Sequence, residues 1–145
     1  MLKKHINGGG LVEDTAHVED SAYVGPSALV YGQATVSGQA LVYGQATVSG
    51  QAAVSGDARV SGEATLSGQA TVSGKATVYG IMRSDGHCFV YVPCSDGKLR
   101  VIAACRYFTM REARKHWKET RGGTALGEET FAILKALAAL QKVQP

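Results

Sequence analysis

The side chains best suited to recognising a partner lie in the C-terminal third of the chain. Thr109-Met110-Arg111-Glu112 matches a capping box, so the sequence predicts a helix that begins there and runs to about Arg121. Basic residues crowd one side of this helix, and a tryptophan belongs to its apolar stripe. Because Trp and Arg are enriched in binding hot spots, we predict that these residues contact a partner. The predicted contact residues are Arg111, Arg114, Trp117, Lys118 and Arg121.

Candidate catalytic residues are sparse elsewhere. One histidine, His17, lies in the repetitive part of the chain, with Glu13 and Glu19 near it in sequence. A general base needs an orienting partner and a cleft for the substrate. No insertion interrupts the repeats from residue 16 to 81, so no loop is present to wall a cleft. We therefore expect His17 to be an ordinary surface residue, and we predict no catalytic residue and no enzyme activity.

The three cysteines are an odd number and lack C-x-x-C spacing. Cys88 and Cys105 lie on apolar faces of strand-like runs, where core packing is the usual role of a cysteine. Together with Cys94, His87 and His116 they could be combined into a metal site, but their spacing matches no zinc module. We predict no metal and no cofactor.

A short-period repeat fills the first half of the chain. Twelve hexapeptides of the form Ala-x-Val-x-Gly-x run from residue 10 to 81. The Ala and Val positions alternate as in a strand, so both should point to one side. A helix is excluded, because a Gly at nearly every fifth position would cost about 1 kcal/mol each relative to Ala. The glycines predict turns, and the fixed period predicts a solenoid.

This repeat resembles the hexapeptide-repeat family, whose fold is a left-handed parallel β-helix. Three hexads make one coil in that family, which implies about four coils for residues 10–81. Most enzymes of the family are trimeric acyltransferases with a catalytic histidine and a loop that protrudes from the coil. The ends of so short a coil expose unpaired backbone. We predict that residues 1–9 form an N-terminal cap and that residues 82–145 form a C-terminal capping or interaction module.

The predicted C-terminal module is a small α+β unit. Asp85-Gly86 and Asp96-Gly97 are hairpin signals beside two strand-like runs, His87–Pro93 and Leu99–Tyr107. Alternation places Cys88, Val90 and Val92 on one face of the first run, and Leu99, Val101, Ala103 and Cys105 on one face of the second. We predict a three-stranded β-meander.

Two helices should follow the meander. The first should end at Gly122-Gly123. Residues 124–127 would then be a connector, and residues 128–142 a second helix with acids at its start. The predicted fold class is therefore mainly β: a left-handed parallel β-helix of about four coils, followed by a β-meander and two helices.

Charge divides between the two halves. Residues 10–80 hold six acids and two bases, a net charge of −4, whereas residues 81–145 hold eleven bases and six acids, a net charge of +5. The whole chain carries only +3, so nucleic acid is a possible but not a favoured partner.

The segment FAILKALAAL is apolar nearly all round apart from Lys135, which predicts burial on several sides and a homo-oligomer, either a dimer or a trimer.

The tail motifs RSDGH-x-F, CR-x-FT-x-x-EA, HW and TRGGT-x-LG, within residues 83–127, resemble small hexapeptide-repeat proteins encoded by prophages and their hosts. That resemblance implies no chemistry. We expect a non-enzymatic protein-binding protein that acts on a host protein or complex, such as a phage-encoded inhibitor of a CRISPR effector. The alternatives are an oligomeric structural scaffold and a hexapeptide-family acyltransferase or its inactive relic.

No signal sequence or transmembrane segment is recognisable, which favours a cytoplasmic protein without a membrane partner.

Overall fold

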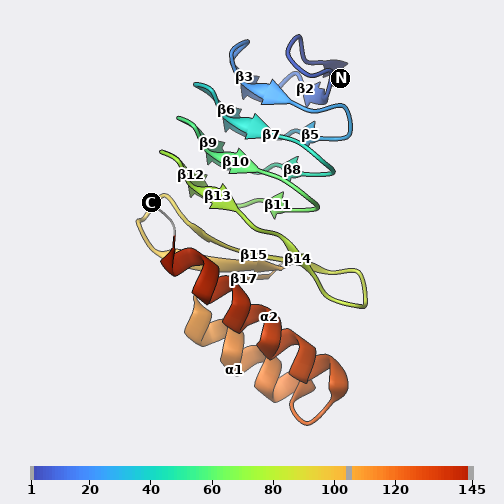
Figure 1. The fold of residues 1–145 in the computed structure, drawn as a ribbon, viewed down its shortest axis with the longest axis vertical. Coiled ribbons are helices and arrows are strands. Elements are labelled where there is room, and N and C mark those ends of the chain that lie inside the picture. Colours follow the sequence, from blue (N-terminus) through green and yellow to red (C-terminus); the bar gives the residue numbers. More distant parts are fainter. Residues whose placement is uncertain (1, 104–105, 144–145) are drawn as a thin grey trace.

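The first half of the chain winds into a β-solenoid of about four turns, drawn in blue to green in Figure 1. The computed structural model describes residues 2–103 and 106–143. Each hexad supplies one strand of two or three residues, and β1 (Leu2–Lys4) precedes them. The hexad strands are β2 (Leu11–Glu13), β3 (His17–Val18), β4 (Tyr23–Val24), β5 (Leu29–Val30), β6 (Thr35–Val36), β7 (Leu41–Val42), β8 (Thr47–Val48), β9 (Ala53–Val54), β10 (Arg59–Val60), β11 (Thr65–Leu66), β12 (Thr71–Val72) and β13 (Thr77–Val78).

Strands three hexads apart pair in parallel, as the repeat predicts. Thr35 pairs with Ala53 and Val36 with Val54, for example. The pairing builds three sheets, with the strand orders β1-β2-β5-β8-β11, β13-β10-β7-β4 and β12-β9-β6-β3. The predicted solenoid architecture is confirmed.

Columns of alanine and valine fill the interior of the solenoid. From Ala22 to Val72, every Ala and Val at the two inward positions of the hexad is at most 2% exposed. Leu66 replaces one valine in this column and is fully buried. Burying each valine contributes roughly 1.5 kcal/mol or more, so the stacked columns are the main apolar stabilisation of this half of the chain.

Residues 2–9 lie across the first turn of the solenoid. β1 pairs antiparallel with β2. The Nε2 atom of the buried His5 is 2.7 Å from the carbonyl oxygen of Ala22. The carbonyl oxygen of Asn7 accepts a hydrogen bond from the Val24 amide, and the Gly10 amide donates to the Val24 carbonyl. These contacts satisfy backbone groups at the end of the stack that have no preceding coil to pair with.

An antiparallel sheet of four strands follows the solenoid: β14 (Ile81–Met82), β15 (Cys88–Pro93), β16 (Leu99–Ala103) and β17 (Arg106–Phe108). The predicted three-stranded meander is therefore wrong by one strand. The run Leu99–Tyr107 is split into two strands, with Ala103 paired to Arg106. No Gly, Pro, Asn or Asp lies between Ala103 and Arg106, so the sequence gives no turn signal there. Cys105, expected on the face of that run, lies outside the described residues.

Both faces of this sheet are buried, because it lies as a layer between the solenoid and the helices (Figure 1). Val90, Val92 and Ile102 join the solenoid core, and Cys88 packs against it. Phe89, Val101 and Ala103 join a second core beneath the helices. The predicted shared face of Cys88, Val90 and Val92 is confirmed.

The two helices are α1 (Met110–Arg121) and α2 (Ala125–Lys142). The predicted capping box of α1 is present, and Gly122 is its C-cap as expected. α2 begins three residues earlier than predicted, because the Thr124 hydroxyl accepts a hydrogen bond from the Gly127 amide and caps the helix there. In the described part of the chain, neither helix is both long and apolar enough to cross a membrane.

Within the single chain, α2 is buried along one side. Its large side chains, Ile133, Leu134 and Leu137, are buried, but Ala132 and Ala136 are exposed. The face that the sequence presented as apolar is a stripe of alanines, whose single methyl groups need little cover. Whether a second copy covers the remaining sides is untested, and the homo-oligomer stays a prediction.

Candidate binding surface and pocket of the C-terminal module

The predicted contact residues divide between the surface and the interior of α1. Arg111, Arg114, Lys118 and Arg121 are exposed. Trp117 is 5% exposed, and its ring packs against Phe89 and Phe108 with centroids 5.1 and 5.7 Å away. Trp117 thus anchors the helix on the sheet, and its contribution to a partner contact would be indirect.

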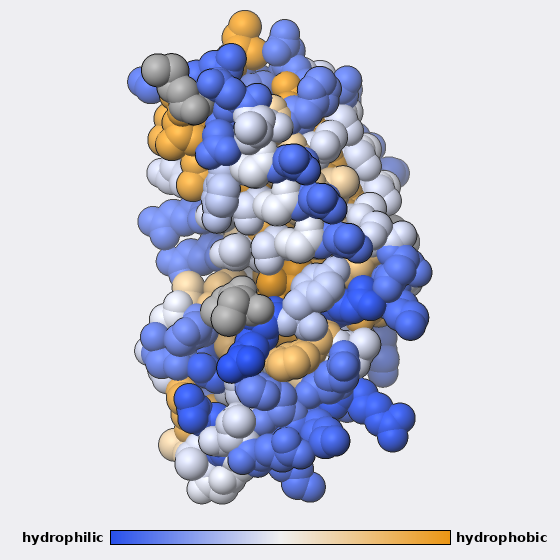
Figure 2. All heavy atoms as spheres, turned by 180° about the vertical axis from the view of Figure 1, so that it is seen from behind, coloured by the Kyte–Doolittle hydropathy of each residue, from blue (hydrophilic) through white to orange (hydrophobic). Residues whose placement is uncertain are grey.

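We call the exposed basic side chains Arg111, Arg114, Lys115 and Lys118 the cationic face of α1. Within the described residues, no ion pair joins any of these four to a carboxylate. Glu112, which follows Arg111 in the sequence, takes part in the capping box, where its Oε1 accepts a hydrogen bond from the Thr109 amide at 2.9 Å. That hydrogen bond lowers the pKa of Glu112. Figure 2 shows hydrophilic side chains gathered over the helical end of the molecule.

A pocket of about 330 Å³ lies between α1 and the helix-facing side of the sheet. Its walls come from the turn between β14 and β15, from β15 to β17, and from the second half of α1. It is lined by Arg83, Asp85, His87, Phe89, Ala103, Arg106, His116, Trp117, Thr120 and Arg121. The structure therefore brings two of the predicted contact residues, Trp117 and Arg121, to this pocket, whereas Arg111, Arg114 and Lys118 lie outside it.

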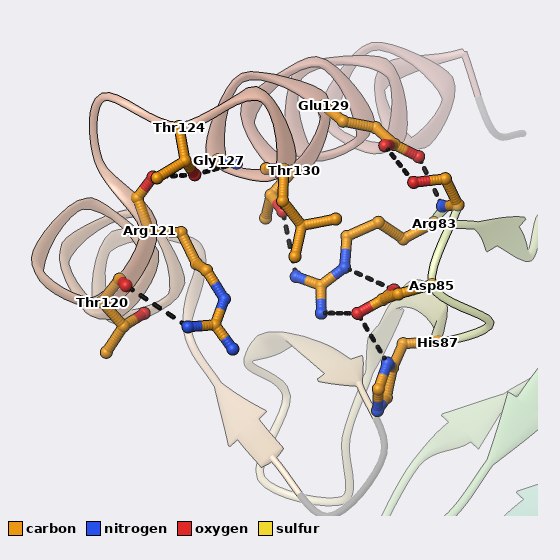
Figure 3. A network of polar contacts seen from close by, with 11 residues as sticks. Arg83, Asp85, His87, Thr120, Arg121, Thr124, Gly127, Glu129 and Thr130 are labelled. Atoms are coloured by element: carbon orange, nitrogen blue, oxygen red, sulfur yellow. Dashed lines mark hydrogen bonds and ion pairs between the residues drawn. The ribbon is translucent and has the colours of Figure 1, made fainter.

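Arg83 is the buried charge of this pocket, with 5% of its surface exposed. Its Nε and Nη2 atoms donate to the two carboxylate oxygens of Asp85 at 2.8 and 2.7 Å, and Nη1 donates to the Thr130 hydroxyl at 3.0 Å (Figure 3). The guanidinium also lies over the Phe89 ring, 5.2 Å from its centroid. Three neighbouring groups therefore hold this side chain, and it cannot easily reorient.

Asp85 is paired on both sides. Besides its two bonds from Arg83, its Oδ2 atom is 3.1 Å from His87 Nδ1. The hydrogen bonds and positive charge of Arg83, with a smaller effect of His87, hold the pKa of Asp85 far below its ordinary value. Asp85 therefore stays ionised across the physiological pH range.

A second set of contacts fixes the turn itself. The carboxylate of Glu129 on α2 accepts hydrogen bonds from the Ser84 amide at 2.5 Å and from the Ser84 hydroxyl at 2.6 Å. Thr130, one residue further, donates to the Leu126 carbonyl while it accepts from Arg83. Residues 83–85 are thus tied to α2 at neighbouring positions, which makes the pocket wall rigid.

The remaining cations of the pocket lack a carboxylate partner within the described chain. Arg121 makes one long hydrogen bond, from Nη1 to the Thr120 carbonyl at 3.4 Å. Three arginines and one aspartate line the pocket, so its walls carry a net charge of +2 with both histidines neutral. From the sequence, Asp85-Gly86 predicts a hairpin turn and does not predict this pocket; the signal present was an Arg and an Asp two residues apart, Arg83 and Asp85.

The other candidate residues do not come together. His17 is exposed on β3. Glu19 accepts a hydrogen bond from the Gly38 amide at 2.7 Å, and Glu13 accepts one from the Thr15 hydroxyl, so both carboxylates have partners other than His17.

The cysteines and histidines of the tail are also dispersed. Burial raises the pKa of the half-buried Cys88 thiol, and the buried Cys94 thiol contacts the Val92 carbonyl. His87 is paired with Asp85, and His116 packs against the Trp117 ring. Across residues 2–103 and 106–143, no three His, Cys, Asp or Glu side chains gather as metal ligands would.

Comparison of the chain with protein-family models, with curated proteins and with solved structures finds no match.

Proposed function

We propose that this protein is a non-enzymatic binding protein whose cationic face docks on an acidic surface of a host protein complex. In the form that the tail motifs favour, it is a cytoplasmic, phage-encoded inhibitor of a defence complex such as a CRISPR effector. Its solenoid, wound left-handed as in hexapeptide-repeat proteins, is the rigid body that carries the docking module.

The observation that carries this proposal is the unpaired charge of α1. Arg111, Arg114, Lys115 and Lys118 are exposed along one short helix, and no described carboxylate pairs with them. Opposite potentials steer association and suppress wrong partners, so a patch of this kind suits an acidic protein surface.

Rigidity supports the same proposal. Trp117 and the capping box fix α1 on the sheet, and the sheet is continuous with the solenoid core. The helix backbone that presents these charges is already ordered, so binding a partner costs conformational entropy mainly in the side chains.

A protein is favoured over nucleic acid as the partner. The cationic face spans about two helical turns, and the adjoining solenoid segment carries a net charge of −4. A long polyanion that followed the surface beyond α1 would meet that negative charge and be repelled. An acidic protein patch can match the cationic face without extending along the solenoid.

The test is quantitative affinity capture with the intact chain, from a nuclease-treated lysate of a bacterial host. The variant Arg111→Gln/Lys118→Gln removes two cations of the cationic face. Losing two close charge pairs should lower partner recovery by at least about tenfold, and recovery by the wild type should fall as salt is raised.

The matched control is Arg59→Gln/Lys75→Gln, which removes two cations from the solenoid and should recover the partner at the wild-type level. Equal recovery by both double variants would contradict the proposal. A partner that the wild type recovers from an untreated lysate but not from the nuclease-treated one would show instead that nucleic acid carries the contact.

A further inference from the structure

We propose that the pocket between α1 and the antiparallel sheet binds the phosphate group of a small phosphorylated molecule. This site is separate from the cationic face: Arg111, Arg114, Lys115 and Lys118 do not line it. The inference does not rest on the docking function, and either can fail without the other.

The first argument is the shape and size of the pocket. A volume of about 330 Å³ is at the lower end of the range in which proteins hold small molecules. Phe89, Ala103 and Trp117 give it an apolar floor, and charged groups surround that floor. This combination suits an organic molecule with one charged group better than it suits a bare ion.

The second argument is the chemistry of the charged side chains in the lining, which are three arginines and a single aspartate. Arg83, Arg106 and Arg121 approach from three different elements, and Figure 3 shows Arg83 and Arg121 on opposite sides of the space between α1 and the turn that follows β14. Arginine matches phosphate and carboxylate oxygens with paired N–H groups. Cations that converge in this way repel one another unless an anion lies between them.

The carboxylate of the pocket does not cancel this charge. Both oxygens of Asp85 are engaged by Arg83, and one also by His87, so it neutralises the buried arginine and leaves Arg106 and Arg121 uncompensated. A guanidinium has five N–H donors, and Arg83 uses three of them in its bonds to Asp85 and Thr130, which leaves two. A buried, immobile arginine with donors to spare is typical of a built anion site.

The third argument separates phosphate from carboxylate. A carboxylate has two oxygens in one plane and matches one arginine, whereas a phosphate has three terminal oxygens that point in different directions. Cations on the β14–β15 turn, on β17 and at the end of α1 surround the pocket from several sides. His87 and His116 also line the pocket, and a ring N–H of either could donate to a further phosphate oxygen.

The test is isothermal titration calorimetry of the intact protein with inorganic phosphate, glycerol 3-phosphate and acetate, at constant ionic strength. We expect the two phosphate probes to bind and acetate to bind at least about tenfold more weakly. We expect glycerol 3-phosphate to bind more tightly than inorganic phosphate, because the apolar floor adds contacts to the organic part. The reverse order would contradict an organic phosphate monoester as the ligand.

The variants Arg121→Gln and Arg106→Gln should each weaken binding of glycerol 3-phosphate about tenfold or more, because each removes a charge-assisted donor. The matched control is Lys135→Gln, which removes an exposed cation of α2 and should change affinity less than twofold. Trp117 fluorescence reports whether each variant is folded. Arg121 lies at the exposed end of a helix, so its variant serves as the test if Arg106→Gln does not fold.

Absence of binding by both phosphate probes, equal binding of acetate, or equal weakening by Lys135→Gln would overturn the proposal. None of these outcomes changes the recovery expected of the Arg111→Gln/Lys118→Gln variant, so failure of the phosphate site and failure of the docking surface are distinguishable.

Discussion

At the scale of single residues, Arg83 organises the C-terminal module. It is buried among a carboxylate, a hydroxyl and an aromatic ring, and each of these belongs to a different part of the module. Breaking one partner of a buried ion pair leaves an uncompensated charge, which is more damaging than losing a surface pair. Asp85 is therefore the position at which the stability of the module depends most directly on protonation.

Acid should destabilise this protein partly through Asp85. Its pKa lies below 3.8 in the folded state, so its contribution to stability is fully present above about pH 4 and is lost as the pH falls through the lower folded value. Asp96, whose pKa Arg100 lowers to about 2, acts in the same direction. We expect Asp85→Asn to lower the midpoint of thermal unfolding at pH 7 and to flatten its fall between pH 5 and pH 2.

Circular dichroism at several pH values would measure this effect. Asp57→Asn, an exposed position on the solenoid, is the control and should retain the wild-type pH dependence. A wild-type midpoint that stays constant from pH 5 to pH 2, or an Asp85→Asn profile parallel to it, would be inconsistent with the observed pairing.

At the scale of elements, the turns of the solenoid depend on glycine for two separable reasons. Gly50 and Gly62 both have positive φ, at 62° and 64°. A Cβ on Gly50 would lie 2.8 Å from the amide nitrogen of Gly68 in the next coil, whereas a Cβ on Gly62 would meet nothing within 4 Å. The first glycine is required by conformation and by stacking, and the second by conformation alone.

Alanine at these two positions should therefore have unequal effects. Gly62→Ala should lower the free energy of unfolding by about 1–2 kcal/mol, because alanine is disfavoured in the left-handed conformation. Gly50→Ala has the same backbone cost and in addition forces two coils apart, so it should lower the free energy of unfolding by at least about 1 kcal/mol more. Chemical denaturation of both variants measures the difference. Equal losses would mean that the coils adjust to the extra methyl group at no cost.

The sequence predicts those elements that a local pattern specifies. The hexad period determines the register of the solenoid, and Thr109 with Glu112 marks the start of α1. The division of Leu99–Tyr107 into two strands could not be predicted, because no Gly, Pro, Asn or Asp separates Ala103 from Arg106. The start of α2 at Ala125 depends on the Thr124 cap. The predicted start was placed three residues later because the acids Glu128 and Glu129 are typical of the first turn of a helix.

The candidate site was predictable only in part, for a similar reason. A basic stripe on α1 is a local pattern and can be read from the sequence. The pocket is not local, because Arg83, Arg106 and Arg121 come from separate elements. Their convergence follows from the packing of α1 on the sheet, which buries Trp117 and turns Arg121 towards the strands.

At the scale of the whole molecule, the antiparallel sheet makes one body of two units that look unrelated in sequence. Val90 and Ile102 belong to the solenoid core, whereas Phe89 and Val101, their neighbours in the same strands, belong to the helical core. Charge is distributed along the same axis, with the negative excess on the solenoid and the positive excess on the module beyond it. We therefore expect recognition at one end of the molecule, on the module that carries α1.

Amide hydrogen exchange of the intact chain, alone and with the captured partner, tests this assignment most directly. Partner binding should slow exchange in residues 110–121 and leave the three solenoid sheets unchanged, because the partner is expected to cover α1 alone. Protection confined to the solenoid, with α1 exchanging at its free rate, would contradict the account.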